Sequence, residues 1–101
     1  MAEVSGYVYL MTQKGTACTK LGWTSRHPAE RARDNTKGPV PLVVARSWRS
    51  SDARFLERLV LRRLSNCRVR GSEWLALPVE DVAEVVESTA ACRGIDIAPA
   101  A

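Results

Sequence analysis

The stretch that decides the fold covers residues 6–31, GYVYLMTQKGTACTKLGWTSRHPAER. A run of β-forming residues, Tyr7 to Met11, precedes a polar, glycine-containing segment that is able to turn. Residues 18–23 alternate well enough for a returning strand, and a helix is predicted to open near Pro28. The stretch therefore predicts a β-hairpin followed by a short helix.

Such a hairpin can carry a small polar site. Tyr9 lies on the first predicted strand and Lys20 on the second. Paired strands bring residues that are distant in sequence close together on one face of a rigid support. We therefore expect Tyr9 and Lys20 to belong to the same site.

The remaining elements follow in a regular order. After the hairpin we expect a helix over 29–35, a strand over 41–49, a helix over 52–64, a short strand within 68–77 and a helix from 78 to 93. Thr24, Ser25 or His27 could cap the first helix. The ends, residues 1–5 and 95–101, are expected to be loose. The order predicts a single small α+β domain, an antiparallel three-stranded sheet flanked by helices.

The second predicted helix has two different faces. Its core-facing stripe is expected to contain Phe55, Leu56, Leu59, Val60 and Leu64. Arg54, Arg58 and Arg62 are spaced four residues apart, so they form a basic ridge on the other side. Glu57 lies at the border between stripe and ridge, at about 100° per residue.

Charge and composition limit the classes of function. The chain has 101 residues and a net charge of +4, and residues 14–70 hold fourteen Lys and Arg against four acids, a net +10. A basic middle favours contact with a polyanion such as DNA, the alternative being scattered solubilising charge. The absence of a long apolar run or basic leader predicts a cytoplasmic protein without membrane contact. Three widely spaced cysteines predict reduced thiols.

The motifs and their spacing resemble the GIY-YIG nucleases. Tyr7-Val8-Tyr9 corresponds to GIY and Lys20-Leu21-Gly22 to YIG, with Arg31 and Glu57 at the positions of the helix arginine and the later glutamate. The small viral and fungal branch of that superfamily is the closer match. The motifs that match it, within about residues 5–86, are GYVYL, KLGWT, PAER, FLER and RGSEWL.

The resemblance implies a metal-dependent endonuclease that hydrolyses DNA phosphodiester bonds. Glu57 would hold Mg²⁺ or Mn²⁺, Arg31 would bind the phosphate, and Tyr9 would orient or deprotonate the attacking water. Lys20 would hold a phosphate as a point charge. From the residues alone, Glu57 could equally be a surface carboxylate paired with an arginine of the ridge.

Contacts to nucleic acid are predicted at five further residues, Trp23, Arg26, Arg54, Arg58 and Arg62. Trp23 follows the KLG motif and could stack a base, although a core role competes with that interpretation. Glu73 is expected to be a turn carboxylate that accepts backbone or arginine hydrogen bonds.

The sequence departs from the family pattern at two important positions. Lys20 replaces the tyrosine of YIG, and Leu61 stands four residues after Glu57, where the small branch usually has histidine. The alternative function is therefore a catalytically inactive relative that binds nucleic acid or regulates an assembly. A protein-interaction module using the acidic last helix is a third hypothesis, and a protein partner could supply specificity. The sequence leaves the oligomeric state open.

Overall fold

The computed structural model describes residues 5–70 and 72–100. Its elements in chain order are β1 (Gly6–Gln13), β2 (Thr19–Thr24), α1 (Pro28–Asn35), β3 (Leu42–Ser50), α2 (Ala53–Arg63), the 3₁₀ turn η1 (Ser65–Cys67), β4 (Trp74–Leu75), α3 (Val79–Arg93) and β5 (Ile97–Pro99). The predicted hairpin, third strand and three helices are confirmed to within a residue or two at their ends. His27 is the residue that caps α1, with its Nδ1 accepting a hydrogen bond from Ala29 N at 3.2 Å.

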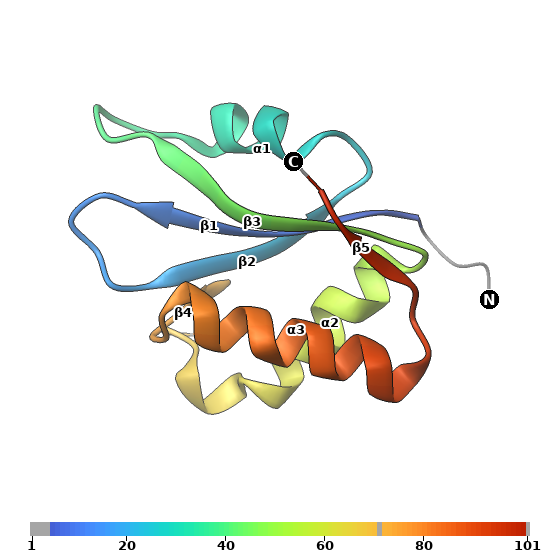
Figure 1. Cartoon of the computed structure of the whole chain (residues 1–101). Helices are drawn as coiled ribbons and strands as arrows, with labels where there is room; N and C mark the ends of the chain where they lie inside the picture. The colour runs from blue at the N-terminus through green and yellow to red at the C-terminus, as the bar shows by residue number, and fades with distance from the viewer. Residues whose placement is uncertain (1–4, 71, 101) are drawn as a thin grey trace.

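The elements form three layers around one sheet. The strand order is β4-β2-β1-β3-β5, and every neighbouring pair is antiparallel. Helix α1 covers one face of the sheet, and α2 and α3 cover the other (Figure 1). The α+β class is confirmed, but the sheet has five strands where three were predicted. The short strand predicted within residues 68–77 is present as β4 and joins the sheet, whereas β5 was not predicted, because it is too short for a clear alternating pattern in the sequence.

Each face of the sheet has its own apolar cluster. On β1, Val8 and Leu10 belong to the larger cluster under α2 and α3, whereas Tyr9 and Met11 belong to a smaller cluster under α1. This division follows from the two-residue period of a strand. Complete burial of one leucine or valine stabilises a fold by about 1.5–3 kcal/mol. The larger cluster, which includes Trp48, therefore anchors the sheet against α2 and α3.

The C-terminal segment is an ordered edge strand. Trp48 pairs with Pro99 across β3 and β5, and Ala100 N donates to Ser47 O at 2.9 Å. The prediction of a loose tail over 95–101 was therefore wrong for the described residues, because the backbone groups of β3 find partners there. Residue 101 and residues 1–4 of the predicted N-terminal loose end lie outside the described chain.

The inward stripe of α2 differs from the prediction at one position. Ala53, Leu56 and Val60 are completely buried, whereas Phe55 is 38% exposed. Phe55 lies under the Arg93 guanidinium, whose Cζ is 5.3 Å from the ring centroid. The assignment of Phe55 to the core was wrong, because Ala53 occupies the core-facing position in the first turn of α2.

Two further expectations concern the whole chain. The cysteines, Cys18, Cys67 and Cys92, are free thiols. Among the described helices, none has the length and apolar character that a bilayer span requires.

Candidate active site at the open edge of the sheet

The hairpin places Tyr9 over a glycine. Tyr9 on β1 faces Gly22 on β2, and a Cβ atom built on Gly22 would lie 2.5 Å from Tyr9 Cζ and overlap the hydroxyl oxygen. The phenol ring therefore extends from β1 across β2, with its side chain almost fully buried. The glycine of the KLG motif is thus required by packing, because any side chain would displace the tyrosine.

Beyond Tyr9, strand β2 is largely an open edge. In the described chain, β4 pairs with β2 at Thr19 and Lys20, and Leu21 N donates to Glu73 O at 3.1 Å. No described strand pairs with the outer side of β2 after that point. The edge next to Gly22 is therefore accessible to groups from the helices on both faces.

Helix α1 brings Arg31 to the Tyr9 hydroxyl from one face. Pro28 and Ala32, four residues apart, are buried against the sheet, and Thr36 fixes the end of the helix by donating to Ala32 O at 2.7 Å. Arg31 lies beside this buried stripe, and its guanidinium is close enough to the Tyr9 hydroxyl to lower the pKa of that group. Its Nε atom is buried and has no partner among the described residues.

Helix α2 brings Glu57 to the same edge from the other face. Leu56 and Val60 fix the inward side of the helix, so Glu57 is half-buried at the border of the core. The negative charge of Glu57 raises the pKa of the Tyr9 hydroxyl, so the two groups lie close enough to interact electrostatically. Tyr9, Arg31 and Glu57 therefore lie close enough to influence one another electrostatically, and their common role in a site stays a prediction.

A second carboxylate, to which the sequence pattern gave a different role, joins these groups. Glu73, immediately before β4, lies within hydrogen-bonding reach of the Glu57 side chain and also acts on Tyr9. The expected turn carboxylate is thus part of the site. Its signal in the sequence was the RGSEWL motif, but only the pairing of β4 with β2 brings it next to Glu57. Gly71 of that motif lies outside the described residues.

The surroundings of Tyr9 and Glu57 raise the pKa of both side chains and so favour their protonated forms. Burial, with the adjacent Glu73 carboxylate, raises the pKa of Glu57 from 4.5 to about 7, although Arg58 and Arg68 oppose the rise. Burial also raises the pKa of Tyr9 above 10, against the hydrogen bond and charge of Arg31. Tyr9 is therefore a neutral hydrogen-bonding group at physiological pH, which argues against its acting as a base.

Lys20 lies on the same face of the sheet as Tyr9. It is two residues away from Gly22, the partner of Tyr9 on β2. It is paired with Met11 and with Trp74, and it is half-buried. The charges that shift the pKa of Tyr9 are those of Arg31, Glu73 and Glu57. Lys20 is therefore at the border of the site, where it could contact a neighbouring phosphate.

Trp23 lies on the face of the sheet opposite to Tyr9. It pairs with Val8 and packs against the cluster under α2 and α3, on the opposite face of the sheet from Tyr9. Its packing favours the core role over base stacking, because alternate strand residues face opposite sides and Trp23 faces the helix that carries Glu57. The tryptophan on the Tyr9 face is Trp74, which packs against the smaller cluster.

The predicted nucleic-acid ligands on α2 are exposed, and this is also true of Arg26. Arg54, Arg58 and Arg62 form the basic ridge on the solvent side of the helix that carries Glu57. Arg26 forms an exposed ion pair with Asp34, with 2.7 Å between Nη2 and Oδ2. An exposed ion pair such as that of Arg26 with Asp34 costs little to open.

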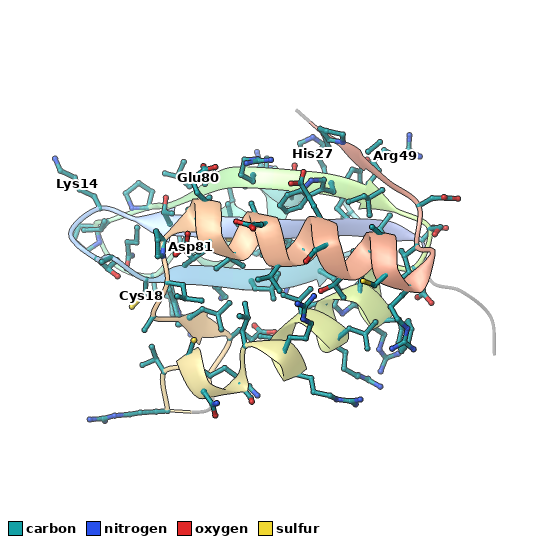
Figure 2. The ribbon with its side chains drawn as sticks, turned by 60° about the horizontal axis from the view of Figure 1, so that its bottom comes forward. Lys14, Cys18, His27, Arg49, Glu80 and Asp81 are labelled. Atoms are coloured by element: carbon teal, nitrogen blue, oxygen red, sulfur yellow. The ribbon has the colours of Figure 1, made fainter. Side chains whose placement is uncertain are left out.

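The acids are concentrated on α3. Figure 2 shows Glu80 and Asp81 on the first turn of α3, while Lys14 projects from the tip of the β1–β2 hairpin. Arg46 of β3 reaches Glu80 and Glu87 at 3.6 and 3.7 Å. The basic ridge and the acidic outer side of α3 therefore give the protein two surfaces of opposite charge.

The residues present fit a divalent cation. Mg²⁺ usually takes one or two protein carboxylates and completes its shell with waters and substrate phosphates. Glu57 and Glu73 provide two such groups, and the unpartnered Nε of Arg31 is suited to an anionic ligand. Among the described residues, no three His, Cys, Asp or Glu side chains gather into a metal cage. Glu57 and Glu73 could hold an ion that completes its shell with waters and phosphate oxygens.

An arginine, a tyrosine and two carboxylates at one open edge are the groups expected in a nuclease-like domain. The family model of the T5orf172 domain matches residues 6–90, and the chain belongs to this family. The family is nuclease-like and indicates interaction with nucleic acid. Comparison with curated proteins and with solved structures gave no significant match. The specific relation to GIY-YIG nucleases stays a prediction.

Proposed function

We propose that this protein is a divalent-metal-dependent endonuclease of the GIY-YIG type that hydrolyses phosphodiester bonds in DNA. The observation that carries the proposal is the convergence of Tyr9, Arg31 and Glu57 at the open edge of β2. They come from a strand and from helices on opposite faces of the sheet. Packing against the sheet on both faces holds these groups in a fixed arrangement, which favours catalysis.

Arg31 would bind the scissile phosphate. Its guanidinium lies near the Tyr9 hydroxyl, whose pKa it lowers, and its buried Nε has no partner among the described residues, so it can donate to a further acceptor. Planar guanidinium groups match phosphate oxygens in pairs and stabilise the negative charge that grows in the transition state. Because α1 is fixed at both ends, this contact would require little reorganisation.

Tyr9 would position the attacking water or a phosphate oxygen. The raised pKa keeps its hydroxyl protonated, so it acts by hydrogen bonding. Proton removal from the water falls more naturally to a carboxylate or to bulk solvent. The role of Tyr9 is therefore geometric, and it depends on the space over Gly22.

Glu57 would hold the cation. A bound Mg²⁺ or Mn²⁺ supplies Lewis-acid stabilisation of charge on the phosphate oxygens. Glu57 must be ionised to act as a ligand, and its pKa of about 7 makes the proton a competitor. Ion binding should therefore weaken in acid.

The basic ridge of α2 would guide the DNA to the site. Successive arginines four residues apart are spaced about 6 Å along the helix axis. They are exposed, and they lie on the helix that also presents Glu57. Binding through the ridge would be sequence-independent and strongly dependent on salt.

The test is a nicking assay on supercoiled plasmid. The wild type is expected to nick in Mg²⁺ or Mn²⁺, and to lose activity in a chelator. Glu57→Gln should abolish nicking while DNA binding is kept or becomes tighter, because a negative group near the phosphate is removed. A matched control is Glu84→Gln on the exposed side of α3.

The second candidate is a nucleic-acid-binding relative without catalysis. Leu61, at the position where the resemblance expects histidine, packs against the larger apolar cluster. Its aliphatic side chain has no group that can transfer a proton. Tight DNA binding with no nicking in any divalent metal would favour this candidate and contradict the nuclease.

A further inference from the structure

We propose that the pocket at the end of the sheet where β1 begins binds an unpaired nucleotide of the DNA, a few positions from the phosphate that is cut. The inference rests on the proposed function and deepens it, because it names a feature of the substrate and a second group of residues that hold it. Arg49 of β3 would bind the phosphate of this nucleotide, and the pocket would take its base.

The pocket lies where β1 begins and β3 ends, beside β5. Its volume of about 510 Å³ falls within the range of about 300–1,000 Å³ that is usual for small-molecule sites. The residues of its lining that can recognise a ligand are Tyr7, Ser25, Arg49, Ser51, Asp96 and Ala98. They come from four segments of the chain, so only the folded sheet forms the pocket.

The wall between β3 and β5 is fixed by backbone hydrogen bonds. Ser51 N donates to Asp96 O at 3.0 Å, and Asp96 N donates to Ser51 Oγ at 3.2 Å. Arg49 pairs with Tyr7 of β1 on one side and with Ala98 of β5 on the other. A wall that is already ordered lowers the entropic cost of binding a ligand.

The chemistry of the lining matches the parts of a nucleotide. Tyr7 supplies an aromatic ring, and such rings stack on bases of any sequence. Arg49 is exposed and forms no ion pair with the acids that the structure describes, so its guanidinium can bind phosphate oxygens. The carboxylate of Asp96 can accept from the amino group of a base. A phosphate alone would be repelled by Asp96 and would leave most of the volume unused.

A line of side chains connects the pocket with the Tyr9 hydroxyl. The ring centroids of Tyr7 and His27 are 6.0 Å apart. Arg31 follows His27 by four residues, about one helical turn, and it lies near the Tyr9 hydroxyl. Figure 2 shows His27 and Arg49 on the same side of the molecule, next to β5. The pocket and the candidate active site therefore share one surface of the protein.

The separation of the two sites suits a short stretch of DNA strand. The pair Tyr7–Arg49 lies two residues along β1 from the pair Tyr9–Gly22, and β2 and β3 lie on opposite sides of β1. The backbone positions of Arg49 and Gly22 are therefore roughly 12 Å apart. A few nucleotides cover this distance at about 3.4 Å each. A base enters a pocket most easily where it is already unpaired, so the substrate has an unpaired nucleotide near the cut.

The test compares the binding of blunt and tailed DNA. The probes are a fluorescent blunt duplex and two shorter duplexes with single-stranded 5′ or 3′ tails, all with the same number of nucleotides. Anisotropy is measured in a chelator, so that nothing is cut. We expect the wild type to bind one tailed duplex about fivefold or more tightly than the blunt one, as stacking of one base typically provides. Arg49→Gln and Ala98→Phe, which fills the pocket, should each bring the two affinities within about twofold of each other.

The matched control is Lys14→Gln. Lys14 projects from the tip of the β1–β2 hairpin, at the opposite end of β1, and its replacement removes the same charge (Figure 2). This variant should keep the preference for the tail. Thermal unfolding shows whether Arg49→Gln is folded, and Ala98→Phe is the second variant if it is not.

The outcomes separate this inference from the proposed function. Equal binding of blunt and tailed DNA by the wild type, or a preference that persists in either folded pocket variant, would overturn the inference. Nicking of plasmid by the wild type would then still support the nuclease. A tail preference that both variants lose, without nicking in any divalent metal, would support the pocket as a binding site and overturn the nuclease.

Discussion

The phenol ring of Tyr9 occupies the space that a side chain at Gly22 would need. The two residues face each other across β1 and β2, and a Cβ atom at position 22 would overlap the hydroxyl and lie 2.5 Å from Cζ. The ring is therefore held over β2 by the absence of a side chain. This contact links the hairpin to the proposed chemistry, because Arg31 is close enough to the hydroxyl to lower its pKa.

Replacing Gly22 with alanine should displace Tyr9. Overpacking of this kind costs about 1–3 kcal/mol of unfolding free energy, and nicking should fall together with the stability. Denaturant unfolding measures the first effect and the plasmid assay the second. In the double variant with Tyr9→Ala the clash is gone, so the cost of Gly22→Ala should largely disappear. Equal costs in both backgrounds would show that the ring does not lie over Gly22.

Replacing Arg31 with lysine should slow DNA cleavage strongly. The charge is kept, but the planar fork that holds Tyr9 and the phosphate together is removed. Removal of one such donor typically reduces the rate by about 10²–10³-fold. Single-turnover nicking measures the effect, with Arg33→Lys, an exposed residue of the same helix, as the control. Normal rates in Arg31→Lys would exclude bidentate phosphate binding there.

Replacing Glu57 with glutamine should change how stability depends on pH. Burial and Glu73 raise the folded-state pKa of Glu57 to about 7, against Arg58 and Arg68, whereas the unfolded value is near 4.5. The native state therefore binds more protons between these values, and the contribution of Glu57 to stability is lost as pH rises through 7. Glutamine does not titrate, so the melting temperature of the variant should rise relative to wild type from about pH 5 to about pH 8.

This comparison is made without divalent metal, because a bound cation would hide the effect. Glu84→Gln is the matched control, since this residue is exposed on α3. A constant difference between Glu57→Gln and wild type over the whole range would mean that Glu57 is solvated like an ordinary surface residue.

Removing the basic ridge should weaken DNA binding without changing the fold. The triple alanine variant of Arg54, Arg58 and Arg62 lacks three side chains that would bind phosphates, and each phosphate left unbound reduces the salt slope of the affinity by about 0.9. Fluorescence anisotropy at several salt concentrations measures both quantities. A control triple with the same change in charge, at Lys37, Arg33 and Arg93, should keep the steeper slope. Equal slopes in the two triples would show that the ridge does not face the DNA.

Removing residues 95–101 should destabilise the protein although they carry no catalytic group. The deletion uncovers the edge of β3, including the partner of Trp48, and leaves the Ser47 carbonyl without Ala100. We expect a lower melting temperature and a greater tendency to aggregate, because an unpaired edge recruits other strands. The control is removal of residue 101 alone. An unchanged melting temperature would mean that β5 contributes nothing to the sheet.

Local patterns were sufficient for most of the elements. The β-formers of residues 7–11, the proline at 28 and the glycine at 94 mark ends that the structure places within a residue or two. Gly94 indeed takes the left-handed conformation of a helix cap, with φ of 64°. The position of Glu57 at the border of a helical stripe was also predictable, because helical periodicity depends only on neighbouring residues.

Long-range pairing decided what these patterns could not. Trp23 and Lys20 belong to one strand, and only the register with β1 shows which of them shares a face with Tyr9. Glu73 became a neighbour of Glu57 because β4 adds to the edge of β2, and residues 97–99 became a strand because β3 offered them an edge. The sequence by itself determined most of the strands and helices and which residue types a nuclease-like site could use. Tertiary structure alone decided which carboxylates meet, since their proximity depends on backbone hydrogen bonds between segments far apart in the chain.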